Sequence, residues 1–254
     1  GFCALIYQAV WLREFRLLFG ASTLANSAVI AIFMGGLGFG GIFFGRRVEL
    51  DKNPLKLYAG LELGISAWIA LYPLLMGITQ SAYIASGGIQ NLGTIGGTLL
   101  RLFLATLVLG PPTFLMGGTL AAAGKAVETD DDANRTRVAL LYGANTLGAV
   151  LGVVLTTFWF LEIFGCRTTL FFAGAINLLL GGIAWKTARD QVIQAFSDRV
   201  TEADEGDEGD KSQPTASTVP GENDGDEAEA PFYQTMIYGF LGLAGCAFFL
   251  MEVV

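Results

Sequence analysis

The chain has 254 residues, of which 53% are apolar, and it carries 34 glycines and a mean hydropathy of +0.54. A water-soluble domain of this length does not need so much apolar surface, so the composition argues against a soluble enzyme. Histidine is absent and the three cysteines are far apart, which removes the usual general base and argues against a zinc site or a disulfide framework. We expect no metal, no cofactor and no nucleic-acid partner for this chain.

The formal net charge of −8 is a local property. Residues 198–229 hold twelve carboxylates against Arg199 and Lys211, so this stretch alone carries −10 and the rest of the chain about +2. The acidity therefore describes one segment, and the remainder of the chain is nearly neutral and apolar.

The apolar runs predict a polytopic bundle of transmembrane helices, an all-α fold. The first run, residues 1–12, is shorter than the roughly 20 residues of a bilayer crossing, so we expect the upstream part of this span to be missing. Long runs follow at residues 21–45, 55–77, 99–123, 138–161, 168–186 and 234–254. Strands of a membrane barrel alternate apolar and polar residues, and these runs do not.

Between the first two runs, residues 11–20 predict a short amphipathic helix at the membrane interface. Trp11 is typical of an interface, and Arg13 and Arg16 reach water from such a position. Arg13 and Glu14 are candidates for this interfacial contact; the alternative is a gate or anion contact made by Arg13.

The second run contains the pattern GxGxxG at Gly36, Gly38 and Gly41. In dinucleotide sites this pattern lies at a turn between a strand and a helix, whereas here it falls within a predicted membrane helix. Small residues four apart instead favour close helix packing. The predicted packing glycines are Gly36, Gly40, Gly41 and Gly45, with Gly148 and Gly152 in the run at 138–161.

Pro111 and Pro112 lie inside the run at 99–123 and predict a break in that helix. The carbonyls that they free need other partners, such as the side chain of Thr113. Broken helices often line transport pathways, but proline is also common in packed membrane helices, and both interpretations stay open.

Polar side chains within the spans are the candidate functional residues, because an ionisable group at that depth costs at least about 2.5 kcal/mol and normally faces a cavity or a partner. We expect a polar cavity; hydrogen bonds between helices are the alternative. The candidates for this cavity are Gln8, Glu62, Asn145 and Glu252, with Asn177 as a further polar residue in a span.

Basic residues predict the orientation. Eleven lysines and arginines fall in the connections after the spans ending at 45, 123 and 186, and four in the alternate connections. The first set is therefore expected in the cytoplasm.

Three regions follow from these patterns. Residues 1–186 form a six-span membrane half, residues 187–233 a disordered acidic cytoplasmic linker, and residues 234–254 the first helix of a second membrane half. An alternative role for the linker is to concentrate cations near the membrane.

The first and last ten residues support a second half. Residues 1–10 and 245–254 align with Gly1 on Gly245, Gln8 on Glu252 and Val10 on Val254. Six spans separate the two copies, as in transporters that are built from two parallel six-helix halves.

The chain resembles a family of bacterial fused proteins whose membrane portion is like the major facilitator superfamily and whose soluble portion is like spermidine synthase. The resemblance is carried by ALIYQAVWLRE from Ala4, FMGGLGFGG from Phe33, PPTFLMGGTL from Pro111 and LYGANTLGAVLG from Leu141. The family often has Glu at the position of Gln8 and Pro at the position of Ala121, so this chain departs from it at both.

The resemblance implies a bacterial inner-membrane location, with the lipid bilayer, a second membrane half and a soluble aminopropyltransferase-like domain as partners. Residues 1–254 hold no catalytic site of that kind. The expected function is a membrane module that anchors such a domain. The alternatives are a secondary transporter of polyamines or another small solute, and a purely structural anchor.

Overall fold

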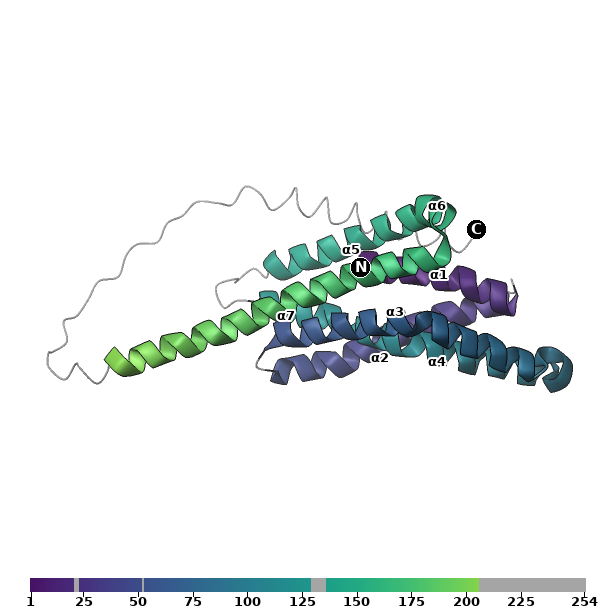
Figure 1. Cartoon of the computed structure of the whole chain (residues 1–254), viewed down its shortest axis with the longest axis horizontal. Coiled ribbons are helices and arrows are strands. Elements are labelled where there is room, and N and C mark those ends of the chain that lie inside the picture. Colours follow the sequence, from purple (N-terminus) through teal and green to yellow (C-terminus); the bar gives the residue numbers. More distant parts are fainter. Residues whose placement is uncertain (21–22, 52, 129–135, 206–254) are drawn as a thin grey trace.

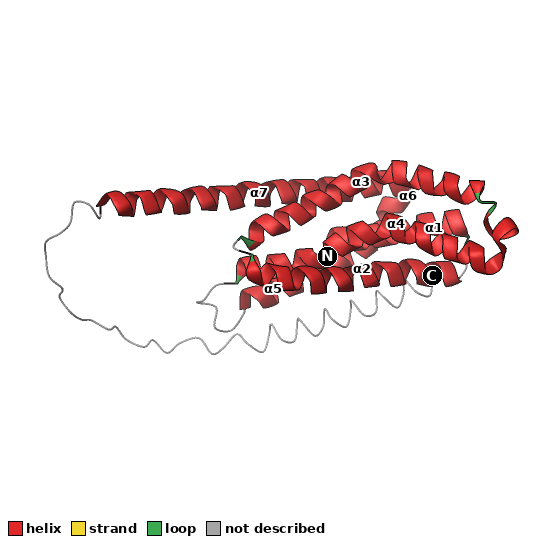
Figure 2. Cartoon of the chain, turned by 90° about the horizontal axis from the view of Figure 1, so that it is seen from below, coloured by secondary structure: helices red, strands yellow, loops and turns green. Residues whose placement is uncertain are grey.

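The structure is a computed structural model that describes residues 1–20, 23–51, 53–128 and 136–205 (Figure 1). All regular elements in these ranges are helical, as the sequence predicted (Figure 2). They are α1 (Phe2–Phe19), α2 (Thr23–Leu50), α3 (Pro54–Ala85), α4 (Gly88–Val127), α5 (Thr136–Leu155), a π-helical turn η1 (Thr156–Phe160), α6 (Leu161–Ile163) and α7 (Gly165–Glu205).

Five stretches are long and apolar enough to cross a membrane: Asn26–Leu50, Pro54–Ala85, Gln90–Val127, Thr136–Ile163 and Gly165–Gln194. They contain four of the five complete runs predicted between residues 21 and 186 and overlap the fifth, 21–45, from Asn26 onward, which supports a helical membrane protein. Each helix is longer than its apolar run. The predicted span at 234–254 lies outside the described residues.

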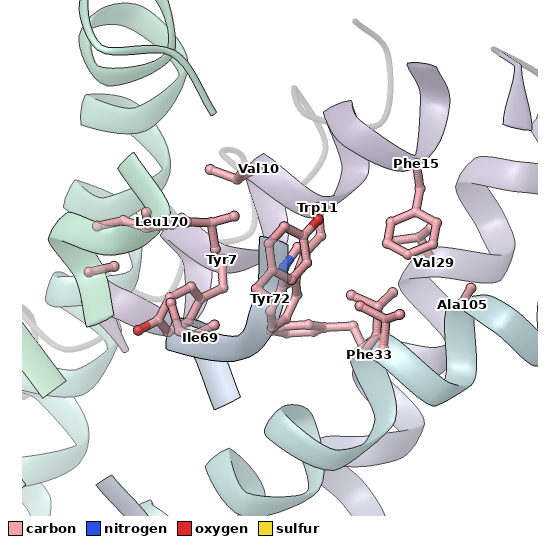
Figure 3. Packing of buried hydrophobic residues seen from close by; sticks show 14 of the residues in the cluster. Tyr7, Val10, Trp11, Phe15, Val29, Phe33, Ile69, Tyr72, Ala105 and Leu170 are labelled. Atoms are coloured by element: carbon pink, nitrogen blue, oxygen red, sulfur yellow. The ribbon is translucent and has the colours of Figure 1, made fainter. Parts of the chain in front are cut away.

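Helix α1 differs from the prediction. Residues 2–19 form one continuous helix, so residues 11–20 are not a separate interfacial helix. Ile6 to Trp11 are buried without a gap, which places α1 at the centre of the core. The prediction that Trp11 lies at a membrane interface is wrong: its ring stacks on Tyr7 with centroids 5.5 Å apart and also contacts Phe33 and Tyr72 (Figure 3). A large aromatic side chain contributes more by packing here than at a surface.

Helix α7 also differs, because it continues to Glu205 and extends past the other helices at one end of the bundle (Figure 1). Residues 187–205 were predicted to be disordered and are helical instead. The sequence has neither glycine nor proline between Gly182 and Gly206, so nothing in it ends the helix earlier. Residues 206–233 of the predicted linker lie outside the described residues.

The packing of the six long helices repeats itself. Helix α2 packs on α4 as α5 packs on α1, and α3 packs on α4 as α7 packs on α1. Helix α3 also packs on α7, and α1–α2 corresponds to α4–α5. Exchanging α1 with α4, α2 with α5 and α3 with α7 therefore maps these contacts onto one another, so the bundle consists of two three-helix units with equivalent packing.

Candidate functional site

Two of the predicted polar candidates, Gln8 and Glu62, lie in the interior. Gln8 on α1 is 2% exposed and Glu62 on α3 is 8% exposed. Glu62 belongs to a stripe of α3 in which Tyr58, Glu62 and Ser66 follow at four-residue spacing and so share one face of the helix. The sequence placed both candidates in spans, and the structure places both in the protein rather than toward lipid.

The carboxyl of Glu62 has neutral side chains around it. The Tyr58 hydroxyl is within hydrogen-bonding reach, and Cys3 and Tyr7 of α1 are near enough to interact electrostatically with it. Among the described residues, no lysine or arginine forms an ion pair with Glu62; the pair recorded there joins Lys125 and Glu128, 2.7 Å apart, at the exposed end of α4. Glu62 is therefore a buried acid without a basic side chain beside it.

Helix α1 contributes three buried polar atoms that have no hydrogen-bond partner: the hydroxyl of Tyr7, Oε1 of Gln8 and Nε1 of Trp11. Tyr7 and Trp11 are 0% exposed. Unpaired polar atoms in a protein interior are uncommon, because each costs about 1 to 3 kcal/mol. Three of them within four residues mark this part of α1 as a candidate site.

Helix α7 completes the arrangement. The Ser66 hydroxyl donates to the Gly174 carbonyl at 2.9 Å, and a Cβ placed on Gly174 would lie 4.0 Å from the Tyr7 hydroxyl. Gly174 and Gly181 both contact α3, so the buried Asn177 between them lies on the same face. We call the polar groups where α1, α3 and α7 meet the polar junction: Tyr7, Gln8, Tyr58, Glu62, Ser66 and Asn177.

Of the other two predicted cavity residues, only Asn145 is described, and it is not part of the polar junction. Asn145 lies half-buried on α5, where its backbone carbonyl approaches Gly1. Glu252 lies outside the described residues. From the predicted set, the structure thus buries Gln8 and Glu62 in the interior, and it places Tyr7, Tyr58 and Ser66, which were not selected from the sequence, on the same helices.

Of the predicted interfacial pair, Arg13 is exposed. Glu14 is partly buried and accepts a hydrogen bond from the Tyr72 hydroxyl at 2.8 Å. Glu14 therefore ties α1 to α3 beyond the aromatic stack of Tyr7 and Trp11, while Arg13 points to the outside.

The predicted break at Pro111 and Pro112 is wrong, since α4 runs through both residues and its non-helical dihedral angles lie at Gly93. Pro112 has no N–H to donate to the Val108 carbonyl four residues before it. The indole of Trp68 on α3 takes that place, with Nε1 3.0 Å from the Val108 oxygen. The Thr113 hydroxyl instead bonds the carbonyls of Leu109, at 2.8 Å, and Gly110, at 3.0 Å.

The predicted packing glycines lie within continuous helices. A Cβ added to Gly36 would collide with Thr113 of α4, and one added to Gly40 would collide with Phe114 of the same helix. A Cβ added to Gly41 would lie 3.6 Å from the carbonyl oxygen of Gly117, also on α4. Gly148 and Gly152 of α5 approach Phe2 of α1 in the same way. Gly45 has nothing within 4 Å. The GxGxxG pattern thus lies inside α2, not at a strand–helix turn.

The missed residues had weak sequence signals. Tyr7 and Trp68 look like ordinary aromatic residues of a span, and Ser66 is small enough to pack anywhere. The four-residue spacing of Tyr58, Glu62 and Ser66 was visible and would have identified the polar face of α3.

No family model, curated protein or solved structure matches this chain.

Proposed function

We propose that this chain is the first six-helix half of a membrane module like the major facilitator superfamily, and that it anchors a soluble aminopropyltransferase-like domain at the cytoplasmic face of a bacterial inner membrane. The observation that carries the membrane part is the repeated packing of α1–α3 and α4–α7. Two three-helix units related in this way form each half of transporters of that superfamily. The soluble domain follows from the sequence resemblance to fused spermidine synthase-like proteins.

The coding sequence beyond codon 254 tests this proposal. We expect five further spans, which complete the second half that residues 234–254 begin, and then a glycine-rich strand–turn–helix of the kind that binds a nucleoside cofactor. Membranes that contain the complete protein should then transfer an aminopropyl group from decarboxylated S-adenosylmethionine to a diamine. A reading frame that stops after a second membrane half would overturn the fused-enzyme part and leave transport as the function.

A second candidate function is secondary transport of polyamines or another small solute. The polar junction favours it, because a purely structural anchor gains nothing from the unpaired atoms of Tyr7, Gln8 and Trp11. The test is uptake of a labelled polyamine into proteoliposomes that contain the complete protein. Uptake that does not exceed that of empty liposomes, with polyamines and with other amines, would remove this candidate.

A further inference from the structure

The polar junction is closely packed, and this limits what it binds. Its member Tyr7 is fully buried and stacks on the equally buried Trp11. The described groove along α3, at Pro73, Gly77 and Ser81, is formed by that one helix and lies apart from Glu62. A solute would need the helices to separate, whereas a proton needs no space beyond the oxygen that it binds.

We infer that Glu62 is a proton-binding site, at which the carboxyl carries its proton in the packed state and releases it when the junction between α1, α3 and α7 opens to water. The proton site itself does not depend on transport. Its role rests on the transport candidate, for which it names the proton as the ion that drives solute movement. The O–H bond of the carboxyl breaks, the proton passes to water, and no electron is transferred.

The surroundings of Glu62 carry the first step of the argument. From its own helix it faces Tyr58, and from α1 it faces Cys3 and Tyr7. The buried stripe of α7 presents the uncharged Asn177. An ionised carboxylate at this depth without a basic side chain costs several kcal/mol, and binding a proton removes that cost.

The unpaired hydroxyl of Tyr7 carries the second step. The Tyr7 hydroxyl is fully desolvated, has no hydrogen-bond partner and lies near enough to Glu62 to interact with it electrostatically. A phenol hydroxyl both donates and accepts, so Tyr7 offers an acceptor to the protonated carboxyl and a donor to the ionised one. The junction is therefore equipped for both states of the acid.

The hydrophobic reagent dicyclohexylcarbodiimide tests the site, because it reacts with protonated carboxyls in apolar surroundings. The complete protein is treated in proteoliposomes between about pH 6 and pH 9 and mapped by mass spectrometry. We expect an adduct on Glu62 that decreases by about tenfold per pH unit once the acid titrates. Glu49, exposed at the end of α2, is the matched control and should stay unmodified in the same digest.

A second measurement does not depend on reagent access. Glu62→Gln keeps the shape of the protonated acid, so its thermal unfolding temperature should be that of the wild type near about pH 4, where the carboxyl is protonated in both the folded and the unfolded state, and higher than that of the wild type near pH 9. A Glu62 that stays unmodified at every pH, together with parallel pH profiles of the two proteins, overturns the inference. An adduct whose yield does not vary with pH overturns it as well.

Transport is read separately. Glu62→Gln should abolish the acceleration of uptake by an imposed pH gradient and leave exchange of labelled for unlabelled solute intact. If the carbodiimide and unfolding results hold and no solute is taken up, the proton site stands and the transport candidate fails.

Discussion

At the scale of single residues, the stability of this protein depends on polar atoms that find partners across helices. Pro112 of α4 has no N–H for the Val108 carbonyl, and the Trp68 indole of α3 donates to that carbonyl instead, at 3.0 Å. Tyr72 and Glu14 form a similar link between α3 and α1. In a bilayer, water does not replace such partners.

Trp68→Phe tests the first of these links. The change removes the indole N–H and leaves the Val108 carbonyl unpaired, so we expect a loss of about 1 kcal/mol and a lower unfolding temperature in detergent. Trp159→Phe is the control, because it also removes one indole and Trp159 is 52% exposed. Equal losses in the two variants would mean that the hydrogen bond contributes nothing.

At the scale of helices, glycine faces decide which helices meet. Gly40 brings α2 against the backbone of α4 at Phe114, whereas Gly38 on the same helix has nothing within 4 Å. Helix α5 uses Gly152 against Phe2 in the equivalent contact on α1. Small residues allow such close approach, and dispersion then accumulates along the contact.

Gly40→Val and Gly38→Val form a matched pair for this contact. The added side chain at position 40 has no room and should push α2 from α4, lowering the yield of monodisperse protein and its unfolding temperature by several degrees. At position 38 we expect values close to the wild type. Size-exclusion chromatography and a thermal ramp in detergent read both, and a Gly40→Val protein as stable as Gly38→Val would contradict the packing.

The existence of these helices could be predicted from the sequence, but their partners could not. Apolar runs long enough for a bilayer identify spans, because no other structure satisfies the backbone there. Both the lipid-facing and the protein-facing sides of these helices are apolar, so periodicity gives little information on which side meets a neighbour. The partner of Val108 is 40 residues away in the sequence, which is why the proline pair was interpreted as a break.

The same reasoning selected two polar residues that the structure buries. Gln8 and Glu62 were selected because charge and amide groups are rare in spans, and both are buried. Tyr7 was not selected and Trp11 was assigned to an interface, because aromatic residues are expected both at interfaces and in cores. Local sequence does not distinguish the two environments; the neighbouring helices do.

At the scale of the whole molecule, the connections lie alternately at the two ends of the bundle (Figure 1). The C-terminal end of α2 carries the basic residues Arg46 and Arg47, and the start of α4 after Gly87 has no basic residue before Arg101. The excess of positive charge predicts that the α2–α3 end faces the cytoplasm.

Single cysteines at the two ends test this orientation in a background with Cys3, Cys166 and Cys246 replaced. Both chosen positions, Asp51 and Gln90, are exposed. We expect Asp51→Cys to react with a membrane-impermeant maleimide only after lysis and Gln90→Cys to react in intact cells. The opposite pattern would reverse the orientation.

The exchange of partners between the two three-helix units has a consequence for biogenesis. Helix α2 packs through its glycines on α4, and α1 packs against the glycines of α5. Each of these early helices therefore packs on a helix that is synthesised later. While the ribosome still holds α4 and α5, the close-contact faces of α1 and α2 are covered by lipid or by an insertion factor. Assembly of this half therefore requires that α4, α5 and α7 have all left the translocation channel.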